Sequence, residues 1–82
     1  MSAETQEKIL VYALERIDGG SALLTRTRAA GITFVFNRTS TVPSAYDAQN
    51  KTITVNPSMG FFTIIDDTMN VMRTAVQSHG MK

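Results

Sequence analysis

Cysteine and tryptophan are absent from this 82-residue sequence, and histidine occurs once, as His79. Without cysteine the chain has no disulfide framework, no thiolate zinc site and no cysteine nucleophile. One histidine also falls short of the pair of imidazoles with which a zinc-peptidase helix grips its metal. We therefore expect a protein that works without a metal and without a cofactor.

Charged side chains are scarce, at 18% of the residues against about 25% in an average soluble domain. The formal net charge is +1, and the basic residues are scattered instead of forming the stripe that phosphate contacts need. So weakly charged a surface favours a protein partner, or self-association into a homo-oligomer, over a nucleic acid.

Long hydrophobic runs are missing as well, and none approaches the roughly 20 residues of a membrane-spanning helix. The first eight residues are polar and lean acidic, unlike a signal peptide. We therefore expect no membrane partner and a cytoplasmic location, either alone or within a larger assembly.

Hydrophobic residues make up 43% of the chain, enough for the core of one domain over residues 1–82. A first helix is predicted between Ser2 as N-cap and the Gly19-Gly20 pair. Its inward residues are Ile9, Leu10, Ala13, Leu14 and Ile17. A second helix is predicted from Ser21 as N-cap to Ala30, before Gly31, with inward residues Leu23, Leu24 and Thr27.

The middle of the chain changes to β-branched and aromatic residues, which predict a strand over residues 32–36. Residues 45–48 and 51–56 predict a hairpin, with Asn50 in the left-handed conformation at its turn. Ile53 and Val55 alternate with Thr52 and Thr54, which predicts a half-exposed strand at a sheet edge and not a buried parallel strand.

A final helix is predicted from Phe61 to Ser78, after the break at residues 57–60. Its apolar stripe comprises Ile64, Ile65, Met69, Met72 and Val76. The predicted fold is therefore α+β, with two N-terminal helices, a small three-stranded sheet that includes a hairpin, and a C-terminal helix.

Residues 45–57 read Ala-Tyr-Asp-Ala-Gln-Asn-Lys-Thr-Ile-Thr-Val-Asn-Pro. They resemble the hairpin G-x-Y-D-x-x-x-N-x-I-x-L-N-P of small bacterial zincin-type metallopeptidase domains. The final helix of that family resembles H-E-L-R-H-A-x-Q, and this chain has the same Arg, Ala and Gln of that pattern at Arg73, Ala75 and Gln77. The resemblance covers Ser21 to Gln77 and implies a minimal zincin-like core, with substrate along the hairpin and zinc on the helix.

The zinc-binding letters of that helix are replaced, because Asn70, Val71 and Thr74 stand where the family has His, Glu and His. A neutral amide is a poor zinc ligand, and valine can neither accept nor donate a proton. The resemblance therefore implies a degenerate domain, a pseudoenzyme without metal, whose former pocket would lie at Asp66, Asn70, Val71 and Thr74.

Several side chains allow both a functional and a structural interpretation. Asp66, Asn70 and Thr74 recur at every fourth position, so they form one polar column, either a residual ligand site or the solvated side of the helix. Asp66 and Asp67 point in different directions and are interpreted as charges at a helix start.

Two candidate interaction surfaces follow from the same residues. Met59, Phe61 and Phe62 form an apolar cluster that either packs in the core or docks a partner. Thr52 and Thr54 mark the predicted edge strand, where an added strand could pair.

The leading functional hypothesis is a non-enzymatic protein-interaction or structural module derived from an inactivated zincin-like domain, of bacterial or phage origin. The alternative is a small enzyme with an unrecognised site, which requires a buried group of shifted pKa among Asp66, Asn70, Thr74 and His79. A third hypothesis, a nucleic-acid-binding module, requires one shared face for Arg26, Arg28, Arg38 and Lys51.

Overall fold

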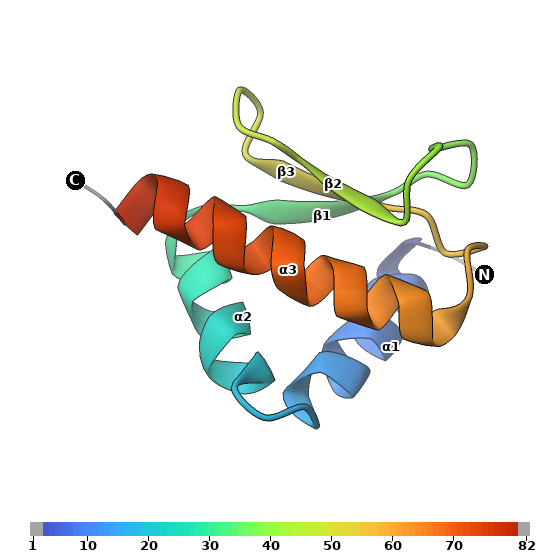
Figure 1. The fold of residues 1–82 in the computed structure, drawn as a ribbon, viewed down its shortest axis with the longest axis horizontal. Helices are drawn as coiled ribbons and strands as arrows, with labels where there is room; N and C mark the ends of the chain where they lie inside the picture. The colour runs from blue at the N-terminus through green and yellow to red at the C-terminus, as the bar shows by residue number, and fades with distance from the viewer. Residues whose placement is uncertain (1–2, 81–82) are drawn as a thin grey trace.

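The computed structural model of the chain describes residues 3–80, and side-chain environments are described for residues 4–78. The predicted cap at Ser2 lies outside this range. Within it, the elements run in the order α1 (Ala3–Glu15), α2 (Gly20–Ala29), β1 (Thr33–Phe36), β2 (Ser44–Asp47), β3 (Thr52–Val55) and α3 (Phe61–Gly80) (Figure 1). This confirms the predicted α+β layout.

The sheet has the strand order β1-β3-β2, so the last strand in sequence is the central one. Ile53 of β3 pairs with Phe34 of β1 in parallel and with Tyr46 of β2 in antiparallel orientation. The predicted edge position of residues 51–56 is therefore wrong, and so is the exclusion of a parallel neighbour. Alternation of apolar and polar residues reports that one face of the sheet is solvated, and it carries no information on how many strands flank it.

The two faces of the sheet differ in what covers them. The three helices lie on one side of the sheet, its inner face (Figure 1). The side chains on this face pack in the core to which all three described helices contribute, and they are Phe34, Phe36, Tyr46, Ile53 and Val55. The outer face is left open, and it carries Thr33, Val35, Ala45 and Asp47 together with the half-buried Thr52 and Thr54.

α3 forms one side of the core with the stripe expected from its sequence. Ile64, Ile65, Met69 and Met72 are buried, and Val76 is half-buried against the same cluster. Each large apolar side chain buried in this way contributes about 1.5–3 kcal/mol relative to an exposed one. Packing of this stripe against α1, α2 and the sheet therefore holds the helices and the sheet together.

The N-cap of α2 lies two residues earlier than predicted, at Gly19 and not at Ser21. The carbonyl oxygen of Gly19 accepts the first helical hydrogen bond from the Leu23 N–H at 3.0 Å, and Ser21 lies exposed inside the first turn. Leu23, Leu24 and Thr27 face inward as predicted.

The other end of α2 closes as the sequence predicts. Gly31 has a φ of +80°, and its N–H donates to the Arg28 oxygen while the Ile32 N–H reaches back to the Thr27 oxygen. This pair of bonds is the Schellman motif, in which a left-handed residue ends a helix and turns the chain into the next element.

The hairpin turn differs from the prediction in one residue, because Lys51 and not Asn50 is left-handed, with a φ of +52°. The Asn50 side chain is instead engaged by Asp47, whose Oδ2 accepts from Asn50 Nδ2 at 2.7 Å. That hydrogen bond, with backbone N–H groups of Asn50 and Gln49, lowers the pKa of the Asp47 carboxyl. The ionised carboxylate thus organises the turn before β3 begins.

The connections at the other end of the sheet are organised by Asn56, which is 2% exposed. Its Nδ2 donates to the carbonyl oxygens of Arg38 at 3.2 Å and Ser40 at 2.7 Å. Its Oδ1 accepts from the N–H and the hydroxyl of Ser58, at 2.9 and 2.6 Å. One buried amide therefore joins the loop after β1 to the turn before α3.

Asp67 links α3 to the sheet, instead of acting only as a charge at the helix start. Its Oδ2 accepts from the backbone N–H of Ser44 at 3.0 Å and from the Ser44 hydroxyl at 2.7 Å. Ser44 begins the edge strand β2 and is buried, so this pair fastens the hairpin to the helix that packs beneath it.

Thr68, fully buried in α3, has a hydroxyl with no hydrogen-bond partner among the described residues. We expect Thr68→Val, which keeps the side-chain shape, to raise the free energy of unfolding by about 1 kcal/mol, because it removes a desolvated hydroxyl. Urea denaturation of the purified chain measures this difference.

Thr27→Val is the matched control, since Thr27 is equally buried but its hydroxyl donates to the Leu23 oxygen at 2.8 Å. This variant is expected to lower the free energy of unfolding by about 0.5–1 kcal/mol. Loss of stability in Thr68→Val would show that its hydroxyl has a partner in solution.

Candidate functional site

The polar column of α3 faces solvent. Asp66, Asn70 and Thr74 are all exposed, and the side chains of Asn70 and Thr74 form hydrogen bonds within the helix. Asn70 Oδ1 accepts from Arg73 Nη1 at 3.0 Å, and the Thr74 hydroxyl donates to the Asn70 carbonyl oxygen at 3.2 Å. The column is therefore the solvated side of an amphipathic helix, and no opposing wall converges on it from the other elements described.

Val71 differs from its neighbours in the column, because it is half-buried against the core. Among the described residues, no three His, Cys, Asp or Glu side chains come close enough together to hold a metal ion. The side chain of His79 lies outside the described residues. The geometry thus supplies no converging set of donors at the positions where the resemblance would place zinc.

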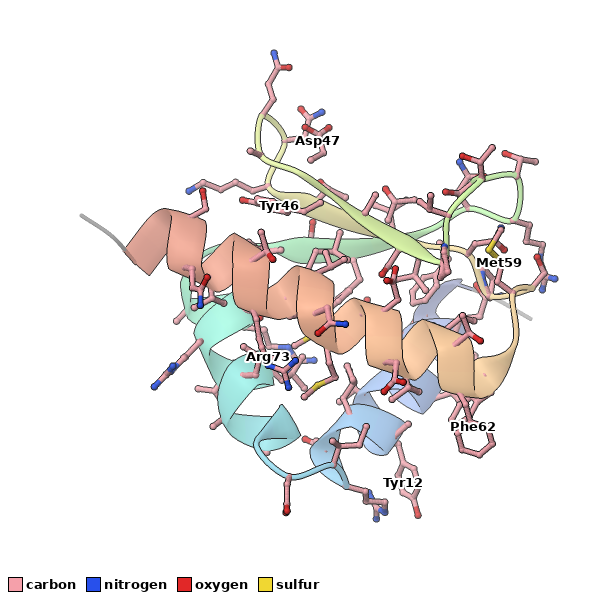
Figure 2. All side chains as sticks on the ribbon, viewed as in Figure 1. Tyr12, Tyr46, Asp47, Met59, Phe62 and Arg73 are labelled. Atoms are coloured by element: carbon pink, nitrogen blue, oxygen red, sulfur yellow. The ribbon has the colours of Figure 1, made fainter. Side chains whose placement is uncertain are left out.

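The apolar cluster at the start of α3 divides into two parts. Met59 is half-buried and packs against the core, whereas Phe61 is 51% and Phe62 is 84% exposed. The two rings contact each other edge to face, with centroids 5.7 Å apart. Figure 2 shows Phe62 projecting from the body of the molecule at the beginning of α3.

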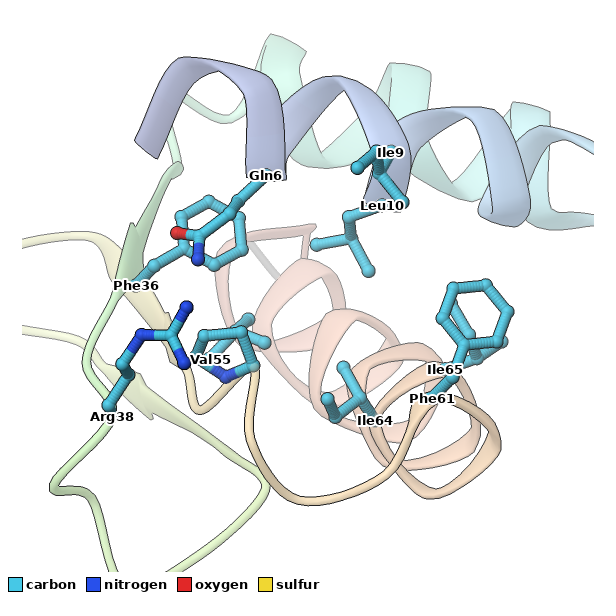
Figure 3. Close-up of a pocket in the computed structure, with 10 residues that line it drawn as sticks. Gln6, Ile9, Leu10, Phe36, Arg38, Val55, Phe61, Ile64 and Ile65 are labelled. Atoms are coloured by element: carbon cyan, nitrogen blue, oxygen red, sulfur yellow. The ribbon is translucent and has the colours of Figure 1, made fainter. Parts of the chain in front are cut away.

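A groove lies beside these rings, between α1 and the first turns of α3 (Figure 3). It encloses about 250 Å³ and is floored by Leu10, Val55, Ile64 and Ile65, with Ile9 and Phe61 on its walls. Sites for small molecules are typically about 300–1,000 Å³. This groove is smaller, so it suits one or two apolar side chains of a partner better than a whole substrate.

Ile9 is a correction to the sequence prediction, because it is 43% exposed instead of buried. It lies at the border of the apolar stripe of α1, where helical periodicity places it inside and the groove leaves it uncovered. We refer to the groove together with Ile9, Phe61 and Phe62 as the α1–α3 surface.

One end of the groove is polar, formed by Gln6 and Arg38 (Figure 3). Arg38 follows β1, and its backbone is held by the hydrogen bond that Asn56 donates to its carbonyl oxygen. Arg38 and Ile9 are distant in the chain and line one groove only because α1 packs beside β1, so no local pattern could predict that they share a site.

The second predicted interaction surface does not form as expected. β3 is hydrogen-bonded on both sides, so no added strand can pair with Thr52 or Thr54. Their side chains instead lie on the outer face of the sheet, flanked by Val35, which is 47% exposed.

The four basic residues considered for nucleic acid do not share one face. Lys51 precedes β3 and Arg38 follows β1, and because these strands are parallel the two residues lie at opposite ends of the sheet. Arg26 and Arg28 lie on α2, on the other side of the core.

Comparison with protein-family models, with curated proteins and with solved structures finds no match to this chain. The resemblance to zincin-like domains therefore rests on its hairpin and helix motifs alone. Within the part of the chain that the structure describes, no helix has the length and apolar character to span a membrane.

Proposed function

We propose that this chain is a non-enzymatic protein-interaction module that binds its partner through the α1–α3 surface. The observation that carries the proposal is Phe62, a large aromatic side chain 84% exposed beside an apolar groove. Contiguous apolar area of this kind is a feature of interaction sites, in which a few aromatic anchors dominate the binding energy.

Among the described residues of α3, no polar side chains converge on one site, which supports the same proposal over the enzymatic alternative. Asp66, Asn70 and Thr74, the described residues on which that alternative depended, are exposed and separate from the groove. An ancestry from an inactivated zincin-like domain, bacterial or phage, belongs to the proposal too. Its support is the motif resemblance and the packing of α3 on the hairpin through Asp67 and Ser44.

The proposal is tested by Phe62→Ser, with Val35→Ser as the matched control. Val35 is also exposed, at 47%, but lies on the outer face of the sheet. We expect Phe62→Ser to weaken association about 30-fold or more, because truncating an aromatic anchor typically costs about 2 kcal/mol. Both variants should keep the free energy of unfolding within about 0.5 kcal/mol, since both side chains lie at the surface.

Two measurements are combined. Light scattering of the purified proteins measures association, and photo-crosslinking residues placed at position 62 or position 35 capture the partner in cells that express the chain. The proposal is supported by a partner or second copy that crosslinks from position 62 but not from position 35, and whose association with the chain is weakened in the separate variant Phe62→Ser. Equal association of all three proteins, or a monomer without crosslinks, contradicts it.

A further inference from the structure

The α1–α3 groove combines an apolar floor with a single charged residue in its wall, Arg38. The one ion pair recorded among the described residues joins Lys8 to Glu4, so none of them neutralises the Arg38 guanidinium. Figure 3 shows Arg38 at one end of the groove and Ile9 and Phe61 toward the other. The groove thus combines an apolar surface that can bind a hydrophobic side chain with the cationic guanidinium of Arg38.

The backbone that carries Arg38 is fixed by its neighbours. The Asn37 N–H donates to the Val55 oxygen at 2.9 Å, and the Thr39 N–H donates to Asn37 Oδ1 at 2.9 Å. With the bond from Asn56 to the Arg38 oxygen, the loop is held on both sides of this residue. Pre-organisation of this kind lowers the entropy lost when a partner binds.

A macromolecule suits this site better than a small ligand does. Phe62 lies next to the groove wall at Phe61 and is 84% exposed, so a ligand confined to about 250 Å³ would leave it uncovered. A peptide segment can place one apolar side chain in the groove while its flanks cover Phe62 and reach Arg38.

We propose that the occupant of the groove is a segment of a partner protein in which a bulky apolar residue is accompanied by an aspartate or glutamate that pairs with Arg38. This inference rests on the proposed function and names the chemistry of its partner. The apolar side chain supplies the burial, and the charge-assisted hydrogen bond from the guanidinium sets orientation and selectivity.

The test selects random peptides displayed on phage against the immobilised wild-type chain, Arg38→Gln and Arg38→Glu, with Phe62→Ser as the reference. We expect wild-type pools to combine a bulky apolar residue with Asp or Glu, and Arg38→Glu pools to replace the acid by Lys or Arg. A synthetic peptide from the wild-type pool should bind Arg38→Gln about tenfold more weakly, and its affinity for the wild type should fall as salt rises.

The outcomes separate this inference from the proposed function. Equal acidic content in the wild-type and Arg38→Gln pools overturns the inference, and loss of those peptides in Phe62→Ser still supports the function. A wild-type dimer that Phe62→Ser dissociates makes a second copy the occupant, which also overturns only the inference. If the wild-type chain enriches no peptides beyond those that the Phe62→Ser reference enriches, both the inference and the proposed function are overturned.

Discussion

Asn56→Ala is expected to lower the free energy of unfolding by about 2–4 kcal/mol, because it removes four side-chain hydrogen bonds from a residue that is 2% exposed. A chain of this size has a total stability of about 4–12 kcal/mol. The midpoint of thermal unfolding should therefore fall by roughly 10–25 °C, which calorimetry or circular dichroism measures.

Two further variants sharpen this prediction. Asn56→Asp keeps the size and the acceptor for Ser58, but turns a carboxylate oxygen toward the carbonyls of Arg38 and Ser40. It should be at least as destabilising as alanine at neutral pH, because those carbonyls lose their donor and face a negative charge. Asn70→Ala, at an exposed site, should change stability by about 0.5 kcal/mol or less. Similar losses at both positions would contradict the role assigned to Asn56.

Gly20→Ala is expected to lower the free energy of unfolding by about 2–4 kcal/mol, since a β-carbon there would overlap the carbonyl oxygen of Leu14. The obstacle is backbone, so it can be relieved only by moving the end of α1. The Leu14 side chain in that region is completely buried, which makes such a movement costly for the core.

Gly19→Ala is the control for this second prediction. Gly19, next to Gly20 in the chain, has open space for a β-carbon but a φ of +79°. Backbone strain alone should cost about 1–2 kcal/mol there. In chemical denaturation, the free energy of unfolding of Gly20→Ala should be clearly lower than that of Gly19→Ala. The reverse order would show that the α1–α2 corner relaxes without loss of packing.

These two sites also bear on the proposed interaction. Asn56 holds the loop that carries Arg38, and Gly20 sets how closely α2 follows α1, whose Ile9 walls the groove. A partner should therefore lose affinity for Asn56→Ala even under conditions where the chain stays folded, because Arg38 is no longer pre-organised.

The elements themselves were predictable from local chemistry. Helical spacing of Ile64, Ile65, Met69 and Met72 located α3 and its buried face, and Gly31 located the end of α2. The strands followed from β-branched and aromatic residues. Such signals depend only on residues a few positions apart, so the sequence carries them in full.

Signals at the borders of elements were less reliable. Both Gly19 and Ser21 suit the start of α2, and tight contact of Gly20 with α1 goes with the earlier start. Lys51 takes the left-handed position, while the Asn50 side chain bonds to the Asp47 carboxylate. In each case more than one residue satisfies the local rule, and the rule by itself does not choose between them.

By itself, the sequence determined the order and type of the elements, the inward face of α3 and the presence of Asn70, Val71 and Thr74, none of them a histidine or a carboxylate, on that helix. Only the tertiary structure decided that β3 is central, that Asp67 binds Ser44 and that Ile9, Arg38 and Phe61 surround one groove. The physical reason is that periodicity encodes which face of an element avoids water. Which element then covers that face, and which apolar residues stay uncovered, depends on packing between segments far apart in the chain.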